Sequence, residues 1–138
     1  MNLESKVSLI TGGSRGIGRG IALKLASLGS DIVLVDISAS DETKNEIEEL
    51  GRKVISLKAD VSKMDETSEV VSKVLKEFEK VDILVNNAGI TRDNLLMKMS
   101  EEDWDSVLDI NLKGSFNMSK SLIRSMLKQK NASIINMA

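Results

Sequence analysis

A glycine-rich loop near the N-terminus is the first stretch of this sequence that could do chemistry. The loop reads TGGSRGIG, follows a short apolar run and leads into residues with helical spacing. Gly12, Gly16 and Gly18 stand where a strand must turn into a helix. Glycine lets the backbone approach a phosphate closely, and a helix N-terminus offers free N–H groups and a positive dipole end. The loop predicts a pyrophosphate site, although a plain tight turn and an S-adenosylmethionine site remain alternatives.

Two carboxylates follow the next predicted strands. Asp36 ends the run IVLVD, and Asp60 comes after the third apolar run in KADVS. A carboxylate at the end of the second strand can accept both hydroxyl groups of an adenosine ribose and would repel a 2′-phosphate. Taken alone, Asp36 is equally well explained as a turn or helix-start residue. Because successive strand ends share one crevice, we expect the glycines and both carboxylates to converge on one nucleotide site.

The composition excludes several classes of chemistry within this chain. The 138 residues include no His, Tyr or Cys, which excludes Ser–His–Asp hydrolysis, cysteine nucleophiles, disulfides and the common zinc sites. We therefore expect no metal. The net charge of −2 provides no field that would attract nucleic acid or an anionic membrane. The N-terminus is neither a signal peptide nor a spanning helix, and the expected location is cytoplasmic.

Five apolar runs alternate with amphipathic stretches along the chain. The predicted strands are residues 7–11, 32–36, 54–59, 81–86 and 134–137, and each lacks polar alternation, as strands covered on both faces do. Apolar residues recur at helical spacing after Ile17 and after Val70. Ser62 and Ser100 are each followed by Asp three residues later, which predicts two capping boxes. Residues 100–130 have room for two helices with a break at Gly114. This alternation requires parallel strands with right-handed crossovers, hence one three-layer α/β domain over residues 1–138.

Four motifs occur in order: TGGSRGIG, ADVS, VNNAG and INLKGSF. Together they resemble the short-chain dehydrogenase/reductase family. The stretch NNAGITRDNLLMKMSEEDWDSVLDINLKG is more specifically similar to the 3-oxoacyl-acyl-carrier-protein reductases of fatty-acid synthesis. The resemblance covers all 138 residues. It implies a Rossmann-like fold with a five-stranded parallel sheet in the order 3-2-1-4-5 and helices on both faces. The implied activity is NAD(P)H-dependent reduction of the carbonyl group of 3-oxoacyl thioesters.

The resemblance also implies roles for individual residues. Asp36 would face the adenosine ribose, Asp60 and Val61 would flank the adenine, and Asn111 would position a proton-relay water. Residues implied to cradle the cofactor phosphates are Gly12, Ser14, Arg15, Gly16, Ile17 and Gly18. Residues implied to line the cofactor and brace the sheet are Asn87, Ala88 and Gly89.

The choice between NAD(H) and NADP(H) stays open at this level. In the family, an Arg at the position of Arg15 and the subfamily as a whole favour NADP(H), whereas a carboxylate at the position of Asp36 favours NAD(H). Residues 37 and 38 are Ile and Ser, so no cation there offsets the negative charge of Asp36. The electrostatics around the 2′-position therefore favour NAD(H).

Asn111 can also be interpreted from its own surroundings. Trp104, Val107 and Leu108 form an apolar stripe at helical spacing, and Asn111 falls on the same stripe. We expect this stripe to face inward, where a polar group needs partners. A structural Asn that bonds a kinked backbone is the alternative to a catalytic one.

The remaining active-site residues of the family fall outside these 138 positions. The resemblance implies a catalytic Ser directly after the fifth strand and a Tyr-x-x-x-Lys motif about a helix later, beyond Ala138. We therefore expect an N-terminal part of a complete reductase that binds cofactor weakly and is inactive alone. The alternatives are a non-catalytic nucleotide-binding or oligomerisation module and one half of a split enzyme. A methyltransferase or flavodoxin-like protein would not explain VNNAG followed by Asn111.

Two further surfaces suggest partners. Arg124, Lys128 and Lys130 form a basic cluster, which in the resembled reductases would meet an acidic acyl carrier protein; solvated residues at a helix end are an equally good interpretation. The resemblance also implies a homo-oligomer, a tetramer in intact members. The residues expected to pack either on the sheet or on a second subunit are Met118, Leu122, Met126 and Leu127.

Overall fold

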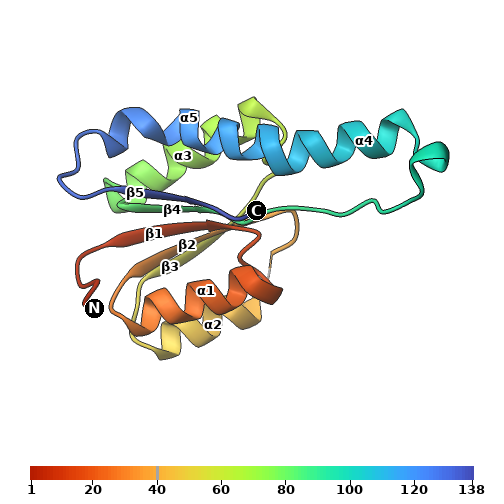
Figure 1. Ribbon diagram of the computed structural model, residues 1–138. Helices are drawn as coiled ribbons and strands as arrows, with labels where there is room; N and C mark the ends of the chain where they lie inside the picture. Colours follow the sequence, from red (N-terminus) through yellow and green to blue (C-terminus); the bar gives the residue numbers. More distant parts are fainter. Residues whose placement is uncertain (40) are drawn as a thin grey trace.

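The computed structural model describes residues 1–39 and 41–138 and contains a five-stranded sheet between two layers of helices (Figure 1). The strands are β1 (Val7–Thr11), β2 (Asp31–Asp36), β3 (Val54–Lys58), β4 (Ile83–Asn86) and β5 (Ser133–Asn136). Every pairing is parallel, and the order is β3-β2-β1-β4-β5. The predicted fold class and strand order are confirmed, with strand ends displaced by one or two residues.

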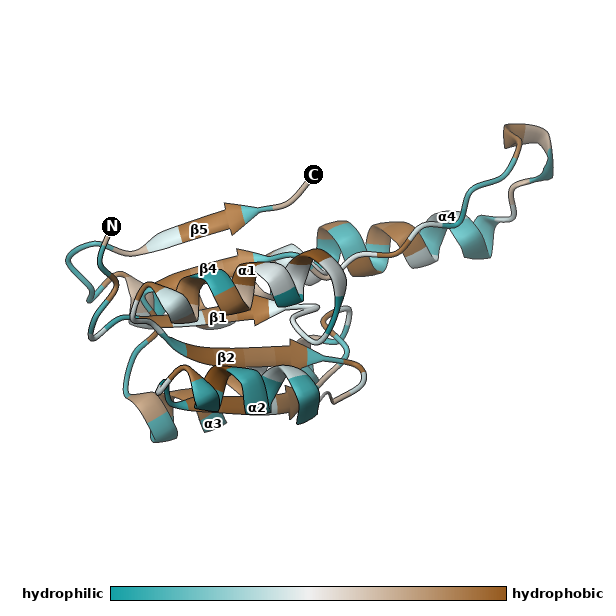
Figure 2. Cartoon of the chain, turned by 90° about the horizontal axis from the view of Figure 1, so that it is seen from below, coloured by the Kyte–Doolittle hydropathy of each residue, from teal (hydrophilic) through white to brown (hydrophobic). Residues whose placement is uncertain are grey.

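Alternate residues of the central strands feed two separate apolar cores. In β2, Val33 and Val35 face the core beneath α3 (Met64–Phe78) and α5 (Gly114–Met126). Ile32 and Leu34 face the core beneath α1 (Gly16–Ser27) and α2 (Asp41–Glu49). All four side chains are fully buried, and Figure 2 shows that β2 is hydrophobic along most of its length. Covering both faces with helices explains why the central strands lack polar alternation. The prediction of two covered faces is wrong for the edge strand β5, whose four residues are all exposed.

One of the two predicted capping boxes is wrong. Ser100 is the N-cap of α4 (Glu101–Val107), and its Oγ accepts a hydrogen bond of 3.0 Å from the N–H of Asp103. Ser62, however, does not cap α3, whose N-cap is Lys63 without a side-chain bond. The Ser62 hydroxyl instead donates to Asp60 Oδ1 at 2.6 Å, so the turn after β3 uses the group that the helix would have needed.

The predicted break at Gly114 is also wrong. α4 continues through a π-helical turn, η2 (Leu108–Lys113), directly into α5, and Gly114 itself is helical. A Cβ at Gly114 would lie 2.6 Å from Cγ2 of Val61. Glycine is therefore present for close packing between α5 and the turn after β3. Met118, Leu122 and Met126 are buried against the sheet, whereas Leu127 is 77% exposed.

The first half of this long helix stands away from the sheet. Figures 1 and 2 show α4, with the segment that precedes it and the short helix η1 (Leu96–Lys98), projecting beyond the strand ends. The predicted inward stripe is wrong for this reason: Trp104 is 56% exposed and Leu108 38% exposed, because no sheet lies beneath them. They face residues 90–99 across a second cavity of about 300 Å³. None of the described helices has the length and apolar character needed to cross a bilayer.

Candidate functional site

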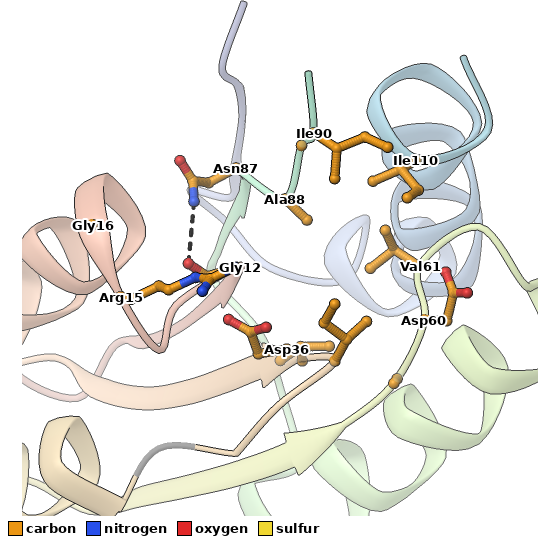
Figure 3. Close-up of a pocket in the computed structure, with 14 residues that line it drawn as sticks. Gly12, Arg15, Gly16, Asp36, Asp60, Val61, Asn87, Ala88, Ile90 and Ile110 are labelled. Atoms are coloured by element: carbon orange, nitrogen blue, oxygen red, sulfur yellow. Dashed lines mark hydrogen bonds between the residues drawn. The ribbon is translucent and has the colours of Figure 1, made fainter. Parts of the chain in front are cut away.

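A cavity of about 360 Å³ opens at the carboxyl edge of the sheet, above the ends of β1 to β4 (Figure 3). β1 lies between β2 and β4. The chain continues from β1 into α1 on one face of the sheet and from β4 toward α5 on the other face. Ligands of open α/β sheets bind in such a crevice. The predicted site residues that line it are Gly12, Arg15, Gly16, Asp36, Asp60, Val61, Asn87, Ala88 and Gly89.

Sequence reasoning missed five lining residues and included four that lie outside the lining. The missed residues are Val35, Ile37, Ala59, Ile90 and Ile110. Each is the chain neighbour of a predicted residue, and this adjacency was the available signal. The predicted residues outside the lining are Ser14, Ile17, Gly18 and Asn111. Their proposed roles in binding or catalysis stay predictions.

The glycine loop has the shape that a pyrophosphate cradle requires. Gly12 and Gly16 adopt left-handed φ angles of +63° and +56°, which side chains rarely tolerate. A Cβ at Gly16 would meet nothing within 4 Å, so its backbone borders open space. A Cβ at Gly18 would lie 2.0 Å from the carbonyl oxygen of Gly12. The first turn of α1 contains no acidic residue, which leaves its N–H groups and dipole available to an anion.

Thr11 and Asn87 fasten this loop to the end of β4. The Thr11 hydroxyl oxygen accepts from the N–H groups of Asn87 at 3.0 Å and Ala88 at 2.9 Å. Asn87 Nδ2 donates back to the carbonyl oxygen of Thr11 at 3.1 Å. It also donates to the carbonyl oxygen of Gly12 at 3.3 Å (Figure 3). The amide of Asn87 therefore braces the loop. Thr11 was not among the predicted site residues.

The carboxylate of Asp36 accepts hydrogen bonds from two backbone N–H groups, one in the glycine loop and one in the turn after β2. Its Oδ2 accepts from the N–H of Ser14 at 3.2 Å, and its Oδ1 accepts from the N–H of Ser38 at 3.4 Å. A carboxylate has about four lone-pair sites, so both oxygens can accept further bonds from a ligand. The Ser14 hydroxyl donates to the carbonyl oxygen of Ser38 at 3.0 Å. Ser14 thus serves the protein framework and does not line the cavity.

The two remaining charged residues of the lining have different surroundings. Arg15 is exposed at the N-cap of α1, on the same rim as Asp36. Asp60 accepts from both the N–H and the hydroxyl of Ser62 at 2.9 and 2.6 Å, and its own N–H donates to Glu66 Oε2 at 2.6 Å. Near the glycine loop, the cavity lining thus contains the cation of Arg15 and the carboxylate of Asp36, and its apolar walls come from Val61, Ala88 and Ile90.

Asn111 is exposed and lies in the π-helical turn η2. Its Oδ1 accepts from the N–H of Ile90 at 2.8 Å, and its Nδ2 donates to the carbonyl oxygen of Ile90 at 3.0 Å. The backbone carbonyl of Asn111 accepts from the Ser115 hydroxyl at 3.1 Å. The structural interpretation, an Asn that bonds backbone beside an irregular helical turn, describes these contacts. They fix the segment that carries Ile90 into the cavity wall.

The basic residues Arg124, Lys128 and Lys130 are all exposed. They lie at the C-terminal end of α5 and just beyond it, where the chain turns back to enter β5. This is the amino edge of the sheet, at the opposite end of α5 from the cavity (Figure 1). A carrier that docked there would not be adjacent to the cavity.

Known proteins are similar to this sequence over most of its length. Residues 6–138 match the family described as short chain dehydrogenase. The chain is 46% identical to 3-oxoacyl-acyl-carrier-protein reductase FabG of Thermotoga maritima, with 100% of this chain and 57% of the relative covered. It is 45% identical to FabG of Staphylococcus epidermidis, with 96% of this chain and 56% of the relative covered. The chain spans little more than half the length of these curated relatives.

A solved structure has a closely similar fold. NAD⁺-bound xylitol dehydrogenase superposes with a TM-score of 0.95 at 32% sequence identity, with 100% of this chain and 54% of that chain covered. The likeness therefore includes every strand that borders the cavity.

Proposed function

The chain belongs to the short-chain dehydrogenase family, and on that premise we propose that residues 1–138 form the cofactor-binding domain of an NAD(P)H-dependent reductase of 3-oxoacyl thioesters. Its similarity to the two FabG reductases supports the substrate class. The observation that supports cofactor binding most directly is the cavity in which the glycine loop and Asp36 meet. A cytoplasmic location stays a prediction from composition.

The lining residues fit a dinucleotide. The backbone around Gly12 and Gly16 would accept the pyrophosphate at the N-terminus of α1, because no side chain occupies the space in front of Gly16. Asp36 would accept hydroxyl groups of the adenosine ribose. The apolar wall formed by Val61, Ala88 and Ile90 would exclude water beside the bases. The bound nicotinamide would supply the hydride for carbonyl reduction.

We propose NAD(H) as the preferred cofactor. A 2′-phosphate bound at this rim would meet the carboxylate of Asp36, and bringing like charges together costs free energy. Arg15 lines the same cavity and would partly offset this cost. Residues 37 and 38 contribute no cation. The charge balance at the rim therefore favours the cofactor without a 2′-phosphate.

These 138 residues alone should bind cofactor weakly and should not reduce substrate. They contain no Tyr, His or Cys, so the proton donor that the family provides through Tyr-x-x-x-Lys is not among them. Loss of general acid catalysis typically costs about 10²–10⁴-fold in rate. A thermal-shift titration with NADH tests binding, and a change in NADH absorbance with an acetoacetyl thioester tests turnover. Lack of any shift at millimolar NADH would count against the proposal, as would enzymatic turnover by the purified chain.

An oligomer is the second part of the proposal, and an exposed apolar stripe along the long helix supports it. We call these residues the helix stripe: Trp104, Leu108, Leu112, Phe116, Ile123 and Leu127, which are 38–77% exposed. Exposed apolar surface of this extent is typical of interaction sites. A second copy of this chain is the occupant that the charges favour.

The charges along the helix are separated into two halves. The acidic residues of the first half are Glu101, Glu102, Asp103, Asp105 and Asp109, and the basic residues of the second half are Lys113, Lys120, Arg124, Lys128 and Lys130. Antiparallel pairing about a two-fold axis would place each acidic half against a basic half. In this arrangement Arg124, Lys128 and Lys130 would face the acidic half of the second copy and not an acyl carrier protein. A non-catalytic oligomerisation module is the alternative function that this surface favours.

A further inference from the structure

The N–H, the hydroxyl and the carbonyl oxygen of Ser14 all make hydrogen bonds to other residues. Its N–H donates to Asp36 Oδ2 at 3.2 Å, and its hydroxyl donates to the carbonyl oxygen of Ser38 at 3.0 Å. Its own carbonyl oxygen accepts from the hydroxyl of Thr43 at 2.9 Å. Ser14 sits between Gly12 and Gly16, both in left-handed conformations. A residue with three hydrogen bonds to other segments therefore lies between two glycines, whose own backbone is conformationally permissive.

The partners in all three hydrogen bonds lie between the end of β2 and the first turn of α2. Asp36 ends β2, Ser38 follows it, and Thr43 lies in the first turn of α2. Asp36 completes the network by accepting from the N–H of Ser38 at 3.4 Å. The glycine loop and the turn that presents Asp36 are thus joined by hydrogen bonds through Ser14.

Thr43 is the most remote member of this network. It is 0% exposed and does not line the cavity. A valine would fill the same space, but it would leave the Ser14 carbonyl without this donor. An unsatisfied polar group at a buried position is costly, so the loop would shift to find another partner.

We propose that Thr43 is a positioning residue that holds the glycine loop and the turn of Asp36 and Ser38 as one unit and thereby sets the preference for NADH over NADPH. The statement about preference rests on the function proposed above, whereas the coupling of the two segments does not. If Ser14 moves, Asp36 loses the N–H that orients Oδ2. A less constrained carboxylate turns more easily away from a 2′-phosphate, so discrimination falls together with affinity.

The test compares Thr43→Val with two matched variants in the 138-residue chain. Thr43→Ser keeps the hydroxyl. Thr67→Val removes a hydroxyl from an equally buried threonine of α3, whose Oγ1 donates to the Met64 carbonyl at 2.9 Å in the opposite helical layer. Ser14→Ala cuts the network at its bond to Ser38 and serves as a second disrupting variant if Thr43→Val does not fold.

The first measurement is amide hydrogen exchange without any cofactor. Thr43→Val should raise the exchange rates of the Ser14 and Ser38 amides about three- to tenfold, as expected for loss of one hydrogen bond. Thr43→Ser and Thr67→Val should leave these two amides within about twofold of the parent, because their network is intact. Equal effects of Thr43→Val and Thr67→Val would overturn the coupling.

The second measurement is the dissociation constant for NADH and for NADPH. Thr43→Val should weaken NADH about three- to tenfold and lower the ratio of the two affinities, whereas Thr43→Ser should restore both. A purely structural role would weaken both cofactors equally and leave the ratio unchanged, which would overturn the claim about preference. If the parent chain binds neither cofactor, the proposed function and the claim about preference fail together, and hydrogen exchange alone decides the coupling.

Discussion

Asn111 uses both polar atoms of its side chain on the backbone of one residue, Ile90: Oδ1 accepts from the N–H at 2.8 Å and Nδ2 donates to the carbonyl oxygen at 3.0 Å. Ile90 lines both the cavity at the sheet edge and the second cavity beneath α4. The π-helical turn η2 carries Asn111, so an irregular helix turn fixes part of the cavity wall. π-bulges of this kind are frequent at functional sites.

Replacing Asn111 with leucine removes both bonds to Ile90. We expect the free energy of unfolding to fall by about 1–2 kcal/mol and the Ile90 amide to exchange faster. NADH binding should weaken because the wall is less well fixed. Chemical denaturation and hydrogen exchange measure these effects. Asn94→Ala is the matched control, since the Asn94 side chain bonds only within the projecting segment; equal losses in both variants would disprove a specific role for Asn111.

Two glycines of α1 should respond in opposite ways to alanine. Gly18→Ala places a Cβ 2.0 Å from the Gly12 carbonyl oxygen and 2.5 Å from Asn87 Nδ2, so we expect a loss of about 1–3 kcal/mol from the forced backbone shift. Gly20→Ala meets nothing within 4 Å and should gain about 0.5–1 kcal/mol through helix propensity. Thermal denaturation of both variants is the measurement. Similar melting temperatures would show that the loop does not pack as described.

Removing the carboxylate of Asp36 should shift the cofactor preference. In Asp36→Ala, NADPH should gain affinity relative to NADH, because repulsion of the 2′-phosphate and the acceptor for the ribose disappear together. A shift of about tenfold in the ratio of dissociation constants corresponds to about 1.4 kcal/mol. Fluorescence titration with both cofactors measures the ratio. Asp65→Ala removes an equal charge from the first turn of α3 and should leave the ratio unchanged; an unchanged ratio in Asp36→Ala as well would refute the role given to Asp36.

A charge within the helix stripe should prevent self-association. Leu112 is 67% exposed near the middle of the stripe, and Leu112→Glu should weaken the dimer about tenfold or more through lost apolar burial. Leu50, 48% exposed just after α2, supplies the control Leu50→Glu. Sedimentation velocity across a concentration series distinguishes the variants. A monomeric parent chain, or equal dissociation of both variants, would contradict the proposed surface.

Sequence alone predicted the sheet well because its evidence is local. Fully apolar runs separated by amphipathic stretches allow few arrangements, so the strand positions and the position of Asp36 at a strand end followed directly. The order of the strands came from the resemblance. The errors arose where long-range packing decides: Trp104 has helical spacing, but the sheet does not extend beneath it. Ser62 does not cap α3 because its hydroxyl bonds to Asp60, two residues away. Gly114 is required by close packing against Val61, which is distant in sequence.

The site residues followed the same rule. The predicted residues that line the cavity lie at or just after the ends of strands, as Asp36 does, or belong to the glycine loop, as Gly12 and Gly16 do, because these positions depend on chain direction alone. The network from Thr43 to Ser14 was not found, since Thr43 belongs to no motif and its bond joins residues 29 positions apart. The resemblance implied that Ser14 helps to cradle the cofactor phosphates, and this role stays a prediction; in the structure its hydroxyl is bonded to Ser38.

An NMR titration of the ¹⁵N-labelled chain with NADH tests the central claim most directly. If the cavity at the carboxyl edge binds the dinucleotide, saturable shifts will concentrate at the amides of Gly12, Gly16 and Ala88. Amides at the amino edge, such as those of Gly29 and Arg52, which border a separate cavity, will stay in place. Absence of shifts at millimolar NADH, or shifts gathered around Gly29 and Arg52, would contradict the account.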